Sequence, residues 1–295
     1  MGITGNCAKF LLYSKKLGVD FSHTVMLGRQ QLFINPIERE ELHKKFYDQP
    51  QLPYSGGFAE PFFKLLGGET VESLDYSDFE GATFIHDLND PIHQIQQNKY
   101  SVVFDGGTLE HVFNFPMAIK NCMDMLTIGG HFVSITPTNN YCGHGFYQFS
   151  PELFFTLFTE QHGFKIKLVA MGVELPSKGI TEWFEVKDPQ RVKRRVTLCN
   201  SHPTSLMIIA EKITETIGSD FRPFQSDYQH IWTVHDSIQN DVQLKGERRW
   251  MHIYRKRMPG FIKKIIRKII GMPEKSVYEE GLGIVNPLFF SKMDV

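Results

Sequence analysis

The sequence has little cysteine and no long hydrophobic run. No apolar run is long enough to span a bilayer, and the N-terminal run over residues 10–13 is too short for a signal peptide. We therefore expect a cytoplasmic protein. The cysteines are scattered and never form a C-x-x-C pair, so neither a zinc site nor a disulfide framework is indicated. They are Cys7, Cys122, Cys142 and Cys199.

The sequence also lacks a strong net charge and a dinucleotide-binding motif. The formal net charge is −1, and the basic residues form no recognised nucleic-acid module, so we expect no nucleic-acid partner. The pattern G-x-G-x-x-G is absent, which weighs against a dinucleotide-dependent enzyme. What remains is the composition of an ordinary globular protein, whose 295 residues suffice for one large domain with an extension.

The stretch from Tyr100 to Pro137 is the most informative part of the chain. The apolar run at 101–104 ends in Asp-Gly-Gly and is typical of a strand buried on both faces. Apolar residues at 117, 118, 122, 125 and 126 predict a helix, which Gly129-Gly130 should end. Residues 131–136 predict a second strand. Short connections make this a strand–helix–strand unit with parallel strands and a right-handed crossover.

Three other short runs that read as strands precede polar loops. Residues 24–27 lead to Gly28, residues 71–75 end in Asp75, and residues 82–86 lead to Asp87. Ligands of an open parallel sheet bind at the carboxyl ends of its strands. The pattern therefore predicts a doubly wound, mostly parallel α/β sheet with a ligand site along that edge.

The central stretch resembles class I S-adenosylmethionine-dependent methyltransferases, of the type 11-like kind. The residues that carry the resemblance are Leu109-Glu110-His111, Gly129-Gly130 and Ile135-Thr136-Pro137, in this order and spacing. The resemblance implies a Rossmann-like fold that ends in an antiparallel strand. Residues 164–171, 196–199 and 206–210 would then be its last strands, with an irregular insertion at 173–195.

The same resemblance implies S-adenosylmethionine as cofactor and assigns residues to it. Asp75 would hold the ribose hydroxyls, since a carboxylate accepts from two vicinal hydroxyls. Asp87 would accept from the adenine amine while Leu88 packs on the ring. In the family, the loop after the first strand is normally rich in glycine. In this sequence the corresponding loop, which follows residues 24–27, contains a single glycine, Gly28. The full predicted set is Gly28, Arg29, Asp75, Tyr76, Asp87, Leu88, Asp105 and Gly106.

The acceptor side is expected on the loop over residues 138–149. Flanking glycines free His144 to face a ligand, which makes it the leading general-base candidate. His111 and Tyr147 are further catalytic candidates, although Glu110 and His111 could instead cap the next helix. Glu110, His111 and His144 could in principle hold a metal, but their spacing is not diagnostic of a metal site, so no metal residue is assigned and the use of a metal stays open.

The acceptor itself leaves no motif. The Gly-His-Gly-Phe-Tyr loop, Trp183 and the basic residues at 191–195 favour a small polar molecule, most simply a hydroxyl of a sugar or glycan. The alternative is a non-catalytic protein of the same fold that binds a partner or glycan, because the loop at Gly28 has lost glycines.

We divide the chain into an N-terminal helix (1–19), a methyltransferase core (20–212) and a C-terminal extension (213–295). In the extension, isoleucines at 262, 265, 266, 269 and 270 form one face of a helix whose other face is basic. Such a helix can dock on protein or lie on an anionic membrane. Peripheral contact with the inner membrane surface through residues 260–271 is therefore an open expectation.

Overall fold

The computed structural model describes residues 2–46, 56–175, 180–192, 200–215 and 289–295, together with the single residues 196, 198, 223 and 225. The chain forms two compact units. The first, called here the sheet unit, comprises residues 1–186, 202–223 and 291–295, and the second comprises residues 187–201 and 224–290. The basic helix predicted at 260–271 lies outside the described residues.

Strands and helices alternate along most of the described chain. The strands are β1 (Gly2–Thr4), β2 (His23–Leu27), β3 (Gln31–Phe33), β4 (Thr70–Asp75), β5 (Phe84–Ile85), β6 (Tyr100–Asp105), β7 (Leu126–Asn139), β8 (Phe164–Leu175), β9 (Ile180–Val186), β10 (Thr204–Lys212) and β11 (Phe290–Lys292). The helices are α1 (Gly5–Lys16), α2 (Pro36–Lys45), α3 (Glu60–Leu65), α4 (Phe115–Met125), α5 (Pro151–Leu157) and α6 (Pro189–Val192).

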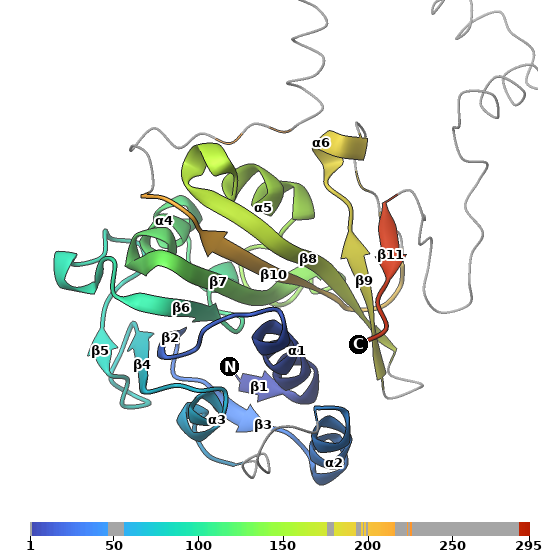
Figure 1. Ribbon diagram of the computed structural model, residues 1–295, viewed down its shortest axis with the longest axis horizontal. Helices are drawn as coiled ribbons and strands as arrows, with labels where there is room; N and C mark the ends of the chain where they lie inside the picture. The colour runs from blue at the N-terminus through green and yellow to red at the C-terminus, as the bar shows by residue number, and fades with distance from the viewer. Residues whose placement is uncertain are drawn as a thin grey trace, which may run out of the picture. The chain divides into compact units, whose positions relative to one another are not determined.

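The main sheet has the order β11-β9-β8-β10-β7-β6-β2-β4-β5 (Figure 1). Strands β7, β6, β2, β4 and β5 pair in parallel, whereas β10 runs antiparallel to both β7 and β8. A small second sheet pairs β1 with β3 in parallel. The Rossmann-like α/β fold with a mostly parallel sheet and a reversed strand near its end is confirmed.

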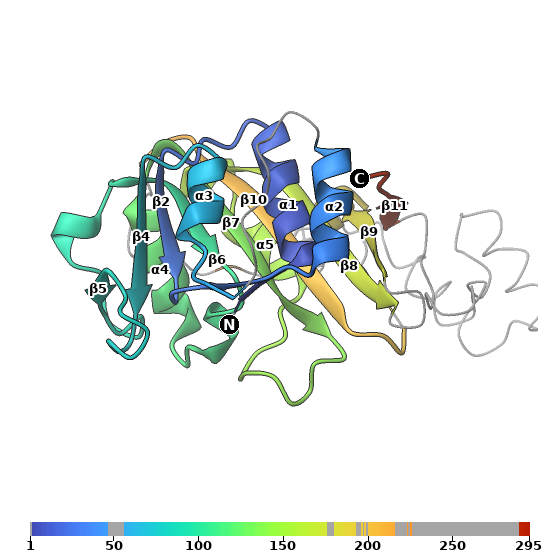
Figure 2. The same cartoon turned by 90° about the horizontal axis from the view of Figure 1, so that it is seen from below.

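Helices cover both faces of the sheet, with α1, α2 and α3 on one side and α4 and α5 on the other (Figure 2). The strand residues alternate accordingly, since successive side chains of a strand point to opposite faces. Phe104 of β6 meets Phe63 of α3 at 5.3 Å between ring centroids, and Phe132 of β7 meets Phe158, just after α5, at 5.1 Å. Burial on both faces explains the near-continuous apolar runs of the central strands.

Local sequence patterns predicted the start of some elements correctly and of others incorrectly. The Ser150 hydroxyl accepts from the Glu152 amide and begins α5 with proline in its first turn, as its sequence predicts. Strand β7, however, already begins at Leu126, before Gly129-Gly130, rather than at His131. The predicted third strand at 82–86 shrinks to Phe84–Ile85.

The prediction for residues 173–199 was wrong over the part that the structure describes. Strand β8 continues to Leu175, and β9 pairs with it antiparallel, so described residues of the expected irregular insertion belong to the sheet. Val196 and Leu198, expected in a strand, lie outside any strand. Trp183 of β9 is only 2% exposed and donates its indole N–H to the Asn6 side chain at 2.8 Å. It is therefore a core residue.

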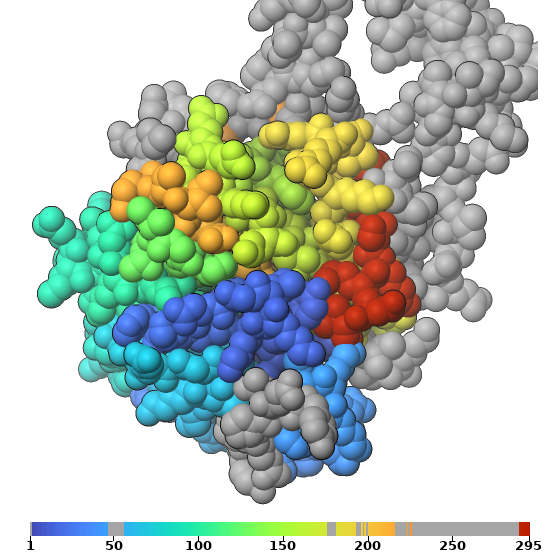
Figure 3. Space-filling view, in the orientation of Figure 1, coloured from blue at the N-terminus to red at the C-terminus, as the bar shows by residue number. Residues whose placement is uncertain are grey.

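The N-terminal helix is part of the sheet unit. Phe10 and Leu11 of α1 are fully buried, and the helix begins where the Thr4 hydroxyl accepts from the Cys7 amide. The C-terminal residues, red in Figure 3, lie beside the blue N-terminal segment, and Met293 and Val295 pack against the same core. Among the residues described, no helix combines the length and apolar character needed to cross a bilayer.

Phe104 tests the importance of this core. Replacing it with alanine (Phe104→Ala) removes a fully buried ring between β6 and α3, so we expect the free energy of unfolding to fall by about 3–5 kcal/mol. Urea denaturation followed by circular dichroism measures the change. Phe79→Ala is the control, because this ring is 91% exposed and its loss should change stability by less than about 0.5 kcal/mol. Equal effects at the two positions would contradict the described packing.

Candidate functional site

The carboxyl ends of the parallel strands meet along one edge of the sheet. Leu27, the last residue of β2, pairs with Leu74 of β4 on one side and with Asp105 of β6 on the other. Asp75 pairs with Ile85 of β5. After β5 the chain crosses back to β6, so the strand order reverses between β2 and β6. In open α/β sheets such a reversal point opens the crevice that holds ligands.

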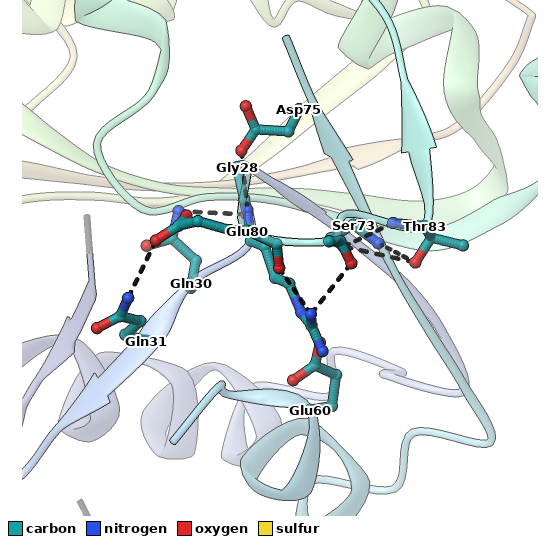
Figure 4. A network of polar contacts seen from close by, with 10 residues as sticks. Gly28, Gln30, Gln31, Glu60, Ser73, Asp75, Glu80 and Thr83 are labelled. Carbon is teal, nitrogen blue, oxygen red and sulfur yellow. Dashed lines mark hydrogen bonds and ion pairs between the residues drawn. The ribbon is translucent and has the colours of Figure 1, made fainter. Parts of the chain in front are cut away.

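The loop after β2 is built differently from a glycine-rich loop (Figure 4). Gly28 has φ 69°, and its amide donates to the Leu74 carbonyl at 2.7 Å. The Arg29 side chain bonds to Glu60 at 2.7 Å and to the Glu80 carbonyl at 2.7 Å, and it stacks on Phe58. The guanidinium is therefore used to hold the loop, and only the backbone of Arg29 approaches the end of β4.

Gln30 is a candidate that the sequence did not reveal. Its side chain is fully buried and its Nε2 donates to the Leu27 carbonyl at 2.8 Å. Its Oε1 accepts no hydrogen bond from the described residues, and a Cβ at Gly106 would lie 3.1 Å from it. A buried acceptor without a donor calls for an explanation, and a polar ligand group between β2 and β6 provides one.

Asp75 stands at the end of β4 where predicted. Its carboxylate accepts from the amides of Arg29 and Ser77, both at 3.4 Å, and these long hydrogen bonds hold it only loosely. Figure 4 shows Asp75 beside Gly28, on the opposite side of the loop from Glu60. Tyr76 follows and is 74% exposed. The two residues are thus accessible beside the β2 loop.

Asp87 and Leu88, both predicted to bind the cofactor, differ in their exposure and contacts. Asn89 donates two hydrogen bonds to Asp87 Oδ1, from its backbone at 2.9 Å and its side chain at 2.7 Å, and these lower the pKa of the Asp87 carboxyl. Leu88 is only 5% exposed, and its carbonyl accepts from Asn121 of α4. Leu88 therefore packs inward, so that mainly Asp87 remains for ligand contact.

Asp105 supports the next loop from beneath. It is fully buried, and it accepts from the Thr108 amide at 2.8 Å and the Ser134 hydroxyl at 2.7 Å. Its carboxylate is not offered to a cofactor in this arrangement. Gly106 follows it, and any Cβ there would meet the Phe104 ring at 2.9 Å and Gln30 Oε1 at 3.1 Å.

Glu110, His111 and His144 come together although 34 residues separate the first from the last. Their potential ligand atoms all lie within 4.8 Å of one another. Glu110 Oε1 is 3.3 Å from His144 Nε2, and the two imidazole rings meet edge to face at 5.0 Å between centroids. Both imidazoles are exposed, whereas the Glu110 side chain is 1% exposed.

The backbone of Glu110 holds the loop that carries His144. Its carbonyl accepts from the amides of Phe146 at 2.7 Å and Tyr147 at 3.2 Å. Gly145 makes this approach possible: it has φ 72°, and a Cβ there would lie 2.8 Å from the Glu110 carbonyl oxygen. Sequence spacing could not reveal this contact, because it depends on how two loops dock.

The environment of Glu110 disfavours its charge. Burial and the nearby Asp105 carboxylate raise the pKa of Glu110 to about 8. Its Oε2 accepts from the Thr136 hydroxyl at 3.1 Å, but its Oε1 accepts no hydrogen bond from the described residues despite the short distance to His144. Burial also lowers the pKa of His111, and His144 lowers it further.

Tyr147, the third catalytic candidate, uses its hydroxyl within the protein. It donates to the Phe113 carbonyl at 2.7 Å, and its ring stacks on Phe149. Two exposed aromatic rings flank this loop: Phe113 is 75% exposed, Phe146 is 68% exposed, and they meet edge to face at 6.2 Å. Tyr147 thus supports the loop, while Phe113 and Phe146 offer apolar surface.

No protein-family model matches the chain, and no curated protein matches it either. Among solved structures, a 1,6-didemethyltoxoflavin-N1-methyltransferase of Burkholderia thailandensis with bound S-adenosylhomocysteine is similar at 11% identity and TM-score 0.38, over 71% of this chain and 78% of that one. A SAM-dependent methyltransferase of Aquifex aeolicus is similar at 12% identity and TM-score 0.34, over 68% and 90% of the two chains. A branched-chain polyamine synthase of Thermus thermophilus reaches 12% identity and TM-score 0.38, over 75% and 59%.

These similarities are distant, and the strand order of the chain itself defines its fold class. Five parallel strands followed by the antiparallel β10, inserted between β7 and β8, give a Rossmann-like α/β sheet with one reversed strand. Strands β9 and β11 extend the sheet beyond β8. Activity does not follow from fold alone, so we base the functional proposal on the residues of the site.

The docking of the two loops can be tested at Gly145. Gly145→Ala would force a Cβ against Glu110 at a positive φ, so we expect a loss of about 1–3 kcal/mol in stability and displacement of His144. Gly143→Ala is a matched control two residues away, because a Cβ there meets nothing within 4 Å. Thermal unfolding and the His144 NMR signals measure the two effects. If Gly145→Ala behaves like Gly143→Ala, the described contact is wrong.

Proposed function

We propose that this protein transfers a methyl group from S-adenosylmethionine to a hydroxyl of a small polar acceptor, and that the acceptor is a sugar or glycan-related molecule. The observation that carries the proposal is the convergence of Asp75, Gln30 and Gly106 at the point where the strand order reverses. A loosely held carboxylate, an unpaired buried amide oxygen and a glycine without room for a side chain fit a ligand with hydroxyl and ammonium donors.

Each residue then has a definite task. Asp75 accepts from the ribose hydroxyls, Asp87 from the adenine amine, and Gln30 Oε1 from the ammonium of the methionine end. Arg29 acts through the loop that it ties to Glu60 and Glu80. The cofactor supplies a methyl group on a sulfonium, which an acceptor oxygen can attack in line.

The acceptor lies on the His144 side of the crevice in this proposal. His144 accepts the hydroxyl proton, and Glu110, 3.3 Å from its Nε2, orients the imidazole. Phe113 and Phe146 present exposed aromatic surface to the apolar face of a sugar ring. Because Trp183 lies in the core, the exposed rings of Phe113 and Phe146 are the reason to test sugars first.

One observation favours a second candidate function, a protein of this fold that binds a partner or glycan without methyl transfer. The loop after β2 has a single glycine, and the side chain of Arg29 fills the space beside Phe58. Cofactor binding separates the two candidates, because only the methyltransferase requires it.

The first test is calorimetric titration with S-adenosylmethionine. We expect binding, and we expect Asp75→Ala to weaken it about 100-fold, since the variant loses charged hydrogen bonds to two hydroxyls. Asp20→Ala is the control, because Asp20 is a carboxylate just before the opposite end of β2 that bonds only locally to Ser22. Absence of heat with the native protein would favour the non-catalytic candidate.

The second test concerns turnover. Release of S-adenosylhomocysteine is followed with a panel of monosaccharides and nucleotide sugars as acceptors. With an acceptor found, His144→Ala should lower turnover about 100-fold or more and leave S-adenosylmethionine affinity unchanged. Gly143→Ala serves as a control in the same loop. Full activity of His144→Ala would exclude His144 as the proton acceptor.

A further inference from the structure

We propose that Glu110, His111 and His144 form a binding site for a borderline divalent cation of the zinc type. The three side chains offer one carboxylate oxygen and two imidazole nitrogens, and these atoms lie within 4.8 Å of one another. It is the one group of this kind among the residues that the structure describes.

The distances suit shared coordination. Two ligands about 2.1 Å from a tetrahedral zinc ion are about 3.4 Å apart. Glu110 Oε1 and His144 Nε2 are already 3.3 Å apart. His111 is farther away, but its ring is exposed and meets the His144 ring at 5.0 Å, so a rotation of the side chain brings a nitrogen into range.

The strongest observation concerns Glu110 Oε1, which faces His144 Nε2 at 3.3 Å. The Glu110 side chain is 1% exposed, and Oε1 accepts no hydrogen bond from the described residues. Burying such an oxygen without a donor is costly, and a cation removes that cost. Its sister atom Oε2 is held by the Thr136 hydroxyl at 3.1 Å, which fixes the carboxylate with Oε1 toward the two imidazoles. Support of a ligand by an outer hydrogen bond is a usual feature of metal sites.

The donor set selects the type of metal. Magnesium and calcium prefer oxygen ligands throughout, whereas imidazole nitrogen with one carboxylate suits zinc, iron and cobalt. Three protein ligands also leave coordination positions open. Since both imidazoles are exposed, these positions face the solvent side of the loop, where the acceptor lies in the proposed function.

The consequence for chemistry rests on the proposed function. An acceptor hydroxyl bound to the cation has a lowered pKa and releases its proton to water. The alkoxide oxygen then bonds to the methyl carbon, the carbon–sulfur bond breaks, and its electron pair leaves with S-adenosylhomocysteine. In this form His144 is a ligand, and the cation takes over the activation that His144 provides in the metal-free protein.

The experiment measures metal binding without cofactor or acceptor, so that it does not depend on methyl transfer. Untagged protein freed of metal by a chelator is titrated with Zn²⁺ by calorimetry and with Co²⁺ by visible absorption. We expect one site per chain, with no comparable binding of Mg²⁺. His144→Ala and His111→Ala should each weaken Zn²⁺ binding at least about tenfold, and Glu110→Gln should do the same with the shape of the side chain kept.

His93→Ala is the matched control. The rings of His86 and His93 also meet edge to face, at 5.2 Å, but they belong to no group of three possible ligands among the described residues. This variant should bind Zn²⁺ like the native protein. The proposed site is wrong if the native protein does not bind Zn²⁺. It is also wrong if His144→Ala and Glu110→Gln bind Zn²⁺ as tightly as the native protein does. The same variants are also titrated with S-adenosylmethionine. Cofactor binding and Zn²⁺ binding are thus measured separately, so a failure of the metal site can be told from a failure of the proposed methyltransferase function.

Discussion

The buried carboxylate of Asp105 is the interaction on which the rest of the site depends. It lies beneath the loop after β6 and accepts from Thr108, Leu109 and Ser134, which ties that loop to β7. Without these donors a fully buried carboxylate would be too costly to keep. Its negative charge also acts on Glu110, whose pKa it raises together with burial. One buried carboxylate, whose own pKa is raised by burial, thus shapes the loop and adds to the effect of burial on the pKa of Glu110.

A second constraint comes from the loop after β2. A glycine-rich loop at this position would let the backbone alone line the crevice. In this chain Arg29 and Gln30 occupy the same stretch, and their side chains turn into the protein to bond with Glu60 and the Leu27 carbonyl. The side-chain hydrogen bonds of Arg29 and Gln30 fix the shape of this loop, whereas a glycine-rich loop would rely on backbone conformation alone. A loop with a single glycine is thus held in one shape by its side chains.

The sequence predicted what depends on neighbouring residues. Strands β2, β4 and β6 and helices α1 and α5 carry their own periodicity and caps, and the acids at 75 and 105 stand at strand ends as expected. It failed where distant segments meet. Strand β9 has no clear local pattern, and Trp183 looked like a binding residue until its contact with Asn6 placed it in the core. Likewise Glu110 and His144 became neighbours only through the docking of two loops.

The contact between Gly145 and Glu110 divides the loop over residues 140–149 into parts with different freedom to change during evolution. Gly145 is fixed, because any side chain there would strike Glu110. Cys142 and Gly143 on one side and Phe146 on the other are exposed, and nothing lies within 4 Å of a Cβ at Gly143. A substitution at position 143 or 146 would therefore change the exposed surface of the loop without disturbing the contact that keeps the His144 imidazole beside the Glu110 carboxylate.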